Sequence, residues 1–397
     1  MNLLDVSTPA ALIDENRMLR NIARMQQRAH ALGVRLRPHI KTSKCLEVAR
    51  RQQAAGAAGI TVSTLKEAEQ FFAGGYPDIL YAVSIAPSKL ARALALRRQG
   101  CALSIVVDSM AAAQAVVDCG RAEAHAFDVM IEIDCDGHRS GVSPEHAELI
   151  EIGGLLHRNG ARLRGVMTHA GSSYDLDNPQ ALERLAEQER SRCVRAAERL
   201  RAAGLPCAEV SVGSTPTALS AANLRGVTEL RAGVYVFFDL VMANVGVCAL
   251  SEVALSILTT VIGHQAEKGW VIVDAGWMAA SRDRGTQRQN IDYGYGAVCD
   301  LDCNPIEDFI LSGANQEHGI MSRRDGRAPD AIGSAIGCAT ACATGQAGIV
   351  ERFPIGTRLR VLPNHACATG AQFPEYQVLT AGDSAPALQT WSRFYGW

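Results

Sequence analysis

One lysine of the chain stands where an amine could act as a nucleophile or carry a proton. Lys41 lies in the segment 37–44, behind a proline and a histidine and directly after a predicted strand. A lysine amine can form an imine with an aldehyde and can later move protons. The position alone is weak evidence, because most lysines are solvated surface charges. Lys44, in the same loop, is predicted to be a solvated or structural residue.

A glycine followed by hydroxyl residues marks a second candidate site. Gly213, Ser214 and Thr215 follow another predicted strand. Such a turn presents backbone N–H groups and hydroxyl donors to a phosphate group. The other interpretation is a capped helix start, because serine and threonine are good N-caps. Considered alone, the capped helix is the favoured interpretation.

A histidine and a cysteine far along the chain form a third candidate site. His365 and Cys367 are two residues apart on a segment predicted to be extended, so they can share one divalent ion. Two protein ligands leave positions open for water and substrate, which suits a catalytic ion. This pair suits Zn²⁺, and Mn²⁺ or Co²⁺ could serve at a site with several open positions. Without further context, a buried cysteine beside a hydrogen-bonded histidine is the favoured alternative.

An arginine in a glycine-rich turn forms the fourth candidate. Arg139 lies in the segment 134–142, at the end of a predicted strand. Its guanidinium group could bind a phenolate or a carboxylate with two donors. The alternative is an ion pair with Asp134 or Asp136.

Lys41, Arg139 and the Gly213 turn each follow a strand in a regular alternation of strand and helix patterns. About eight such units favour a closed parallel barrel over an open sheet. In that architecture functional residues lie after the carboxyl ends of the strands, as these candidates do. We therefore predict an α/β fold with a (β/α)8 TIM-type barrel over residues 8–244. The expected strands cover residues 9–13, 34–37, 59–62, 79–82, 103–107, 129–133, 163–167, 209–212 and 229–235.

The pattern changes after about residue 244. Short β runs at 254–262, 270–274, 358–362 and 375–379 are separated by Gly, Pro, Asp and Asn. We predict a second, mainly β domain over residues 245–397, together with residues 1–7, that carries the metal site. The stretch 326–348, rich in Ala, Gly and Cys, is predicted to be a surface insertion.

The composition excludes several classes of partner. The 397 residues are 48% hydrophobic and carry a net charge of −2, which gives no reason to expect nucleic acid or a membrane as partner. The 12 cysteines are scattered and none falls in a CxxC pair. The first residues have neither a basic region nor an apolar stretch, so we expect no secretory leader. Reduced thiols and a cytoplasmic location follow as expectations.

Five segments together resemble the alanine-racemase-like, fold-type III enzymes that use pyridoxal phosphate (PLP). Within these enzymes the chain is similar to the D-serine dehydratase and D-threonine aldolase group. Such enzymes pair a barrel with a β domain and form head-to-tail dimers. The resemblance therefore implies a homodimer whose active site lies at the subunit interface. It is carried by residues 37–42, 63–68, 213–216, 316–319 and 365–369.

The resemblance also implies roles for individual barrel residues. Lys41 matches the lysine that holds PLP as a Schiff base, and Arg139 matches the arginine near the cofactor phenolate. His169 looks like the residue that packs on the cofactor ring, and Tyr174 resembles an active-site tyrosine. Arg231 occupies the position where alanine racemases place an arginine against the pyridine nitrogen, although related dehydratases and aldolases vary there.

The phosphate cup and the metal pair are implied in the same way. The cup matches Gly213, Ser214 and Thr215 with the backbone of Gly233 and Val234. His365 and Cys367 match the metal pair of the D-serine dehydratases. The aldolases usually carry an aspartate at the second position, so Cys367 favours elimination over aldol cleavage.

The expected reaction is a PLP- and metal-dependent dehydration of a small D-3-hydroxy amino acid. The expected substrate is D-threo-3-hydroxyaspartate, which would give oxaloacetate and ammonia. The alternatives are a D-serine dehydratase, a D-threonine-type aldolase that yields glycine and an aldehyde, a metal-independent racemase and a barrel-only PLP carrier protein. Arg282 and Arg284 are candidates to bind the additional carboxylate of 3-hydroxyaspartate. Two solvated loop arginines are the alternative.

Overall fold

A computed structural model describes residues 3–326, 348–380 and 387–397. The predicted insertion at 326–348 lies, except for its two end residues, outside the described residues. The chain divides into two compact units, each described here by itself. The barrel unit comprises Leu19–Val236, Val245–Val247 and Ser392–Trp397, and the β unit comprises Met1–Met18, Phe237–Asn244 and Cys248–Trp391.

Eight parallel strands form the sheet of the barrel unit, in the order β2-β9-β8-β7-β6-β5-β4-β3. A bridge between His39 and Thr61 joins its two ends: the Thr61 N–H donates to the Pro38 carbonyl (2.9 Å), and the Ile40 N–H donates to the Thr61 carbonyl (3.0 Å). The strands are β2 (Arg35–Leu36), β3 (Ile60–Val62), β4 (Asp78–Ser84), β5 (Ala102–Val107), β6 (Asp128–Ile133), β7 (Arg162–Thr168), β8 (Glu209–Val212) and β9 (Glu229–Leu230).

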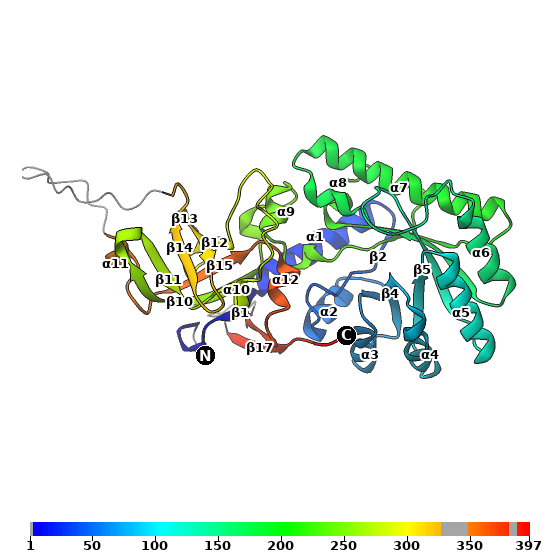
Figure 1. The fold of residues 1–397 in the computed structure, drawn as a ribbon, viewed down its shortest axis with the longest axis horizontal. Helices are drawn as coiled ribbons and strands as arrows, with labels where there is room; N and C mark the ends of the chain where they lie inside the picture. Colours follow the sequence, from blue (N-terminus) through cyan, green and yellow to red (C-terminus); the bar gives the residue numbers. More distant parts are fainter. Residues whose placement is uncertain (1–2, 327–347, 381–386) are drawn as a thin grey trace, which may run out of the picture. The chain divides into compact units, whose positions relative to one another are not determined.

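Helices alternate with these strands and lie around the outside of the sheet (Figure 1). Polar side chains begin several of them, since the side chains of Thr64, Ser109 and Asn178 each accept the backbone N–H three residues on. The predicted parallel barrel is confirmed. The helices are α1 (Glu15–Ala31), α2 (Leu46–Ala54), α3 (Leu65–Ala73), α4 (Leu90–Arg98), α5 (Met110–Ala122), α6 (Glu148–Arg158), α7 (Pro179–Ala202) and α8 (Thr215–Ser220).

The β unit contains a nine-stranded sheet in the order β11-β14-β13-β12-β15-β10-β1-β16-β17. An additional β10–β11 pairing closes its first six strands into a ring, so the predicted mainly β part is confirmed. The strands are β1 (Ala10–Asp14), β10 (Leu255–Gln265), β11 (Trp270–Val273), β12 (Gly296–Cys299), β13 (Pro305–Ala314), β14 (Gly319–Arg323), β15 (Arg358–Pro363), β16 (Glu375–Leu379) and β17 (Leu388–Ser392). Its short helices are α9 (Leu240–Asn244), α10 (Trp277–Ala280), α11 (Ile349–Arg352) and α12 (Ala366–Gly370).

The first strand belongs to the β unit, whereas the sequence pattern placed it in the barrel. β1 pairs antiparallel with β10 and parallel with β16, and its Leu12 and Ile13 are fully buried. Strand β1 followed by helix α1 has the same local pattern as a barrel unit. Hydrophobic periodicity predicts a strand but does not tell which sheet the strand joins. Within the described residues, no helix is long and apolar enough to span a membrane.

Candidate active site and metal centre

Lys41 and Lys44 lie in the loop after β2 and have different surroundings. The Lys44 ammonium group pairs with the buried Glu67 carboxylate at 2.9 Å, and the Lys44 carbonyl accepts the Phe394 N–H at 2.7 Å. The partly exposed Lys41 amine makes no hydrogen bond or ion pair with a described residue. Lys44 is therefore structural, and Lys41 is the amine available for chemistry.

His169 follows β7 directly, and the positive charge of Lys41 acts on its imidazole ring. Its Nδ1 donates to the Gly213 carbonyl at 2.7 Å, which leaves Nε2 as an acceptor. Burial, with the positive charges of Lys41 and Arg139, lowers the pKa of His169 to about 3. The Tyr174 ring centroid lies 6.2 Å from that of His169. His169 is thus a neutral imidazole held in a fixed orientation.

His39 is a second neutral imidazole of this site. Burial, then Lys41 and Arg231, lower its pKa well below the usual value. Its Nδ1 is buried and has no hydrogen-bond partner among the described residues, whereas Nε2 lies 3.4 Å from the Ser63 hydroxyl. A buried polar atom without a partner calls for a ligand or a water molecule.

Two glycines bring the backbone close around this site. Gly213 has φ near +149°, and a Cβ there would lie 2.4 Å from the Arg231 carbonyl oxygen. A Cβ on Gly233 would lie 2.9 Å from the His39 carbonyl oxygen. Side chains at these two positions would therefore collide with the strand-end backbone, so both sites need glycine.

The turn after Gly213 is also a capped helix start, as the alternative interpretation proposed. Ser214 is the N-cap of α8, and its hydroxyl accepts the Thr217 N–H and bonds to the Ser173 hydroxyl at 2.9 Å. The Thr215 hydroxyl accepts the Tyr235 N–H at 3.2 Å. The capping also occupies the Ser214 N–H, which donates to the Thr217 hydroxyl at 3.2 Å, so a ligand here would use the other donors of the turn.

Glu189, on α7, is a buried carboxylate that the sequence did not single out. It accepts the Ala170 N–H (2.9 Å), the Gly213 N–H (3.2 Å) and the Thr217 hydroxyl (2.7 Å). Burial raises its pKa, against the effect of these three hydrogen bonds. The carboxylate joins the segment after His169 to the Gly213 turn. Its neighbours on α7 are mostly charged, so no local pattern marks it.

Arg231 is held by a buried chain of polar groups. Its Nε donates to the Ser211 hydroxyl (2.9 Å) and its Nη2 to the Thr168 carbonyl (2.5 Å). Ser211 in turn donates to Glu229 at 2.8 Å, and Glu229 accepts from Arg37 at 2.7 Å. Burial lowers the pKa of Arg231.

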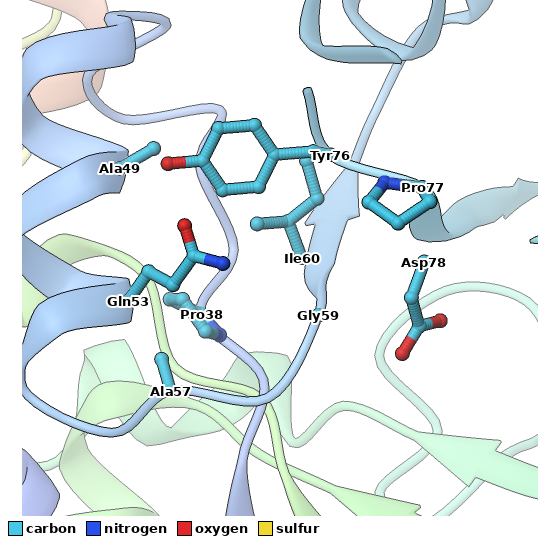
Figure 2. A pocket seen from close by; sticks show the side chains of 9 residues that line it. All are labelled: Pro38, Ala49, Gln53, Ala57, Gly59, Ile60, Tyr76, Pro77 and Asp78. Atoms are coloured by element: carbon cyan, nitrogen blue, oxygen red, sulfur yellow. The ribbon is translucent and has the colours of Figure 1, made fainter. Parts of the chain in front are cut away.

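This series of hydrogen-bonded polar groups ends at Asp78, which forms two hydrogen bonds with Arg37 at 2.9 and 2.8 Å. Asp78 lies at the edge of a surface pocket of about 150 Å³ that also includes Tyr76 and Gln53 (Figure 2). The Tyr76 hydroxyl is buried and has no partner among the described residues. The predicted site residues do not line this pocket, so it is separate from the Lys41 site.

Arg139 pairs with a different carboxylate from those considered in the sequence. Its Nη2 donates to Glu132 at 3.3 Å, while Asp136 accepts from the Ser172 N–H and hydroxyl. Asp134 accepts the N–H groups of the turn itself. The alternative of an ion pair with Asp134 or Asp136 is therefore wrong, because turn and loop groups occupy both carboxylates.

His365 and Cys367 lie after β15 in the β unit. His365 is the N-cap of α12, so Cys367 lies in the first helical turn and the prediction of an extended segment is wrong. The buried Asp239 carboxylate explains the helix, because it accepts the Ala366 N–H at 2.9 Å. His365 Nδ1 bonds to Asp283 at 2.6 Å, and His365 also shares a side-chain hydrogen bond with Cys367.

Arg282 and Arg284 flank Asp283 but differ in their contacts. Arg284 pairs with Asp292 at 3.0 Å and lies over the Tyr295 ring, 5.0 Å from its centroid. The Arg282 guanidinium lies 4.0 Å from the Trp277 ring centroid and has no carboxylate partner among the described residues.

Comparison with known proteins decides the family. The alanine racemase N-terminal domain model matches residues 13–241, and the putative serine dehydratase domain model matches residues 254–379. The chain belongs to the alanine racemase N-terminal domain family. It is 65% identical to D-threo-3-hydroxyaspartate dehydratase of Delftia sp., over 100% of this chain and 99% of that protein. It is 29% identical to D-serine dehydratase of Dictyostelium discoideum, over 94% of each.

Solved structures agree with this membership. The Delftia dehydratase matches with a TM-score of 0.93 over 100% of this chain and 99% of that one. Two further structures, each described as a D-threo-3-hydroxyaspartate dehydratase, carry alanine in place of a histidine and of a cysteine two positions on, and the cysteine variant is in the metal-free form. These descriptions apply to those proteins.

The barrel site fits the anionic, aldehyde-bearing cofactor that the resemblance to this family's fold-type III enzymes implies. Lys41, Arg139 and Arg231 supply positive charge, and the neutral His39 and His169 add none. The glycines at the turns let backbone N–H groups approach a phosphate. The unpartnered Nδ1 of His39 supplies a polar contact still to be satisfied.

The β-unit site fits a divalent ion by the chemistry of its donors. Imidazole and thiolate both bind Zn²⁺, and a carboxylate that holds the other ring nitrogen is a common arrangement for a metal-binding histidine. Within the described ranges, no third His, Cys, Asp or Glu side chain joins this pair in metal-binding geometry. The sequence missed Asp283, although it lies between the two arginines that were singled out.

Proposed function

We propose that the chain is a PLP- and divalent-metal-dependent dehydratase, a carbon–oxygen lyase. It would convert D-threo-3-hydroxyaspartate to oxaloacetate and ammonia. Similarity to the Delftia dehydratase over the whole chain carries this proposal. The Lys41 amine without a described partner, together with the His365 and Cys367 pair, supports it.

Lys41 would be both the anchor of the cofactor and the base for the α-proton. Bound PLP makes the α-hydrogen of the substrate acidic by delocalising electrons into its ring. The amine of Lys41 would take that proton as a general base. The other roles follow the resemblance: Arg139 near the phenolate, His169 and Tyr174 at the ring, Arg231 at the pyridine nitrogen, and Gly213, Ser214, Thr215, Gly233 and Val234 around the phosphate.

His365 and Cys367 would hold the metal ion. A bound divalent ion acts as a Lewis acid that makes the 3-hydroxyl a better leaving group. Asp283 would orient the His365 ring through its bond to Nδ1. Zn²⁺ is the proposed ion, with Mn²⁺ or Co²⁺ as alternatives.

We assign the additional substrate carboxylate to Arg282 in preference to Arg284. Arg284 already pairs with Asp292, whereas the Arg282 guanidinium lies 4.0 Å from the Trp277 ring centroid and its N–H donors have no described carboxylate partner. Arg282→Ala should raise KM for D-threo-3-hydroxyaspartate at least about tenfold and leave KM for D-serine within about twofold. Equal changes for both substrates would exclude this role, and Arg284→Ala is the matched control.

We also propose a homodimer in which the partner's β domain completes the active site. The resemblance to fold-type III enzymes supports this arrangement. Lys41→Ala and Cys367→Ala protomers, each inactive alone, are mixed in equal amounts. If one site takes residues from two protomers, half of the dimers are heterodimers with one intact site of two, so about a quarter of the wild-type activity should return. No recovery in a mixture shown by mass spectrometry to contain heterodimers would exclude shared sites.

One assay separates the candidate functions. The PLP- and metal-loaded protein is incubated with D-threo-3-hydroxyaspartate, D-serine and D-threonine, and 2-oxo acid, ammonia and glycine are measured. We expect oxo acid and ammonia, fastest from D-threo-3-hydroxyaspartate. Glycine as the main product would establish an aldolase. Full activity after chelation would exclude the metal-assisted route.

A further inference from the structure

The hairpin between β12 and β13 contains a cysteine where the backbone favours glycine. The Cys303 N–H donates to the Asp300 carbonyl (3.1 Å), and the Asp300 N–H donates to the Asn304 carbonyl (3.0 Å). This is a three-residue loop whose last position takes the left-handed conformation, and Cys303 has φ of 67° there. A side chain at such a position costs about 1 kcal/mol or more, so its presence indicates a use for the side chain.

The Cys303 side chain points into the β unit, against a second cysteine. Cys299 is fully buried and Cys303 is 5% exposed, and their two thiols share a hydrogen bond. The hydrogen bond from Cys299 lowers the pKa of Cys303 and raises that of Cys299. This direction agrees with the geometry, because Cys303 is the thiol that an arginine contacts.

Two arginines stabilise negative charge on Cys303. Arg17 Nη1 lies 3.3 Å from its sulfur. Arg360 pairs in register with Cys299 and is 2% exposed, with Nη1 on the Leu301 carbonyl at 3.4 Å. Arg360 Nη2 is buried without a hydrogen-bond partner among the described residues. A thiolate on Cys303 would supply counter-charge to both guanidinium groups.

We propose that Cys299 and Cys303 form a peroxide-reactive thiol pair that closes into a disulfide. The Cys303 thiolate attacks one oxygen of a hydroperoxide, the O–O bond breaks, and Cys303 becomes a sulfenic acid with release of hydroxide. The Cys299 sulfur then attacks the Cys303 sulfur, an S–S bond forms, and the displaced hydroxide leaves as water with the Cys299 proton. Two thiols lose two electrons and the peroxide gains them, so one hydrogen peroxide yields two waters.

Neither cysteine is among the residues proposed for the active site, although the pair shares the β unit with His365 and Cys367. Lys41 lies in the other unit, and Arg360 is five residues before His365. The low exposure of Cys303 selects for a small oxidant such as hydrogen peroxide over bulky disulfides. Cys119, on α5, is more exposed but has a raised pKa, so it provides the internal comparison.

Peptide mapping of the holoenzyme under non-reducing conditions tests the proposal. After limited hydrogen peroxide, the peptide with both cysteines should be lighter by two hydrogen atoms, with a rate at least about tenfold above that of Cys119 oxidation. Cys299→Ala should leave a sulfenic acid on Cys303 that dimedone traps. Arg17→Met should slow the reaction about fivefold or more, because it removes a donor to the thiolate.

Cys303→Gly is the matched control, because glycine suits the left-handed turn and the variant should fold. It should show no oxidation at Cys299 and should keep wild-type turnover. Oxidation of Cys119 while Cys299 and Cys303 stay alkylatable would overturn the proposal. So would a stable sulfenic acid on Cys303 in the wild-type protein.

Discussion

The two candidate sites differ in how completely the surrounding protein fixes them. Around Lys41, buried groups such as Glu189 and Arg231 join successive strand ends through hydrogen bonds. In the β unit, the His365 side chain is 40% exposed and is held mainly through Asp283 and Cys367. The barrel site is suited to fixing a large cofactor at many points, whereas the β-unit site leaves coordination positions open.

Replacing Lys41 is the strongest test of this contrast. Lys41→Ala should reduce kcat for D-threo-3-hydroxyaspartate by about 10³-fold or more, because it removes both the anchor and the base. Borohydride should fix the cofactor to the wild-type protein and not to the variant, as followed by mass spectrometry and absorbance.

Lys44→Met is the control for Lys41. Its partner Glu67 is buried and loses a donor, so the variant should lose stability, by about 1–3 kcal/mol, while borohydride still fixes the cofactor. If Lys44→Met abolished fixation and Lys41→Ala did not, the two lysines would have to exchange roles.

Replacing a proposed metal ligand should impair the β-unit site and leave the barrel site intact. His365→Ala and Cys367→Ala should each lower dehydration by about 10²–10³-fold, because the 3-hydroxyl loses its Lewis acid. PLP binding should stay within about threefold, since the residues proposed to contact the cofactor in this chain all lie in the barrel. Metal content by atomic spectroscopy and PLP affinity by absorbance are measured on the same samples, and Cys248→Ala is a cysteine control. A loss of PLP in parallel with the metal would contradict two separately fixed sites.

Much of the barrel, and less of its buried polar groups, could be predicted from the sequence. Strands such as β5 and β6 follow from short β-branched runs between helical patterns. The membership of β1 could not be predicted, because pairing with β10 is a long-range choice. Glu189 was missed for a related reason: its three partners come from segments distant along the chain, and a glutamate in a charged helix has no local signature.

The β unit was harder to predict in detail. Its strands β12, β13 and β14 differ in length, from four to ten residues, and lack a regular spacing. The first N–H of the helix at Ala366–Gly370 donates to Asp239, more than a hundred residues earlier. A histidine and a cysteine two positions apart are enough to suggest a metal ion from the sequence. That Asp283 is the hydrogen-bond partner of His365 could be seen only in the structure.

Glu189 allows a milder test of how firmly the barrel fixes its cofactor. Glu189→Gln keeps an acceptor for the N–H groups of Ala170 and Gly213, so PLP affinity should change by less than about threefold. Glu189→Ala leaves those buried N–H groups without a partner, at a cost of about 1–3 kcal/mol, and should weaken PLP binding about tenfold or more. Equilibrium dialysis with PLP provides the measurement, and equal affinities for both variants would show that Glu189 does not support the turn.

The smallest expected effect concerns the protonation of His169. Its pKa is about 3 in the folded barrel because of burial, Lys41 and Arg139, and about 6.5 in an unfolded chain. As the pH falls below about 6.5, the unfolded state binds a proton that the folded state does not, so stability is lost down to about pH 3. At pH 5 this one group costs about 2 kcal/mol, from about 1.36 kcal/mol per pH unit.

His169→Gln should therefore lose about 2 kcal/mol less than the wild type between pH 7 and pH 5, by urea unfolding of the PLP-free protein. His39 is retained in both proteins, so its own titration cancels in the comparison. NMR should show no titration of the His169 ring between pH 8 and pH 5. A midpoint near pH 6 would mean that the ring is solvated and that the barrel does not hold a neutral imidazole beside Lys41. The barrel site would then be as open to solvent at this histidine as the β-unit site is at His365.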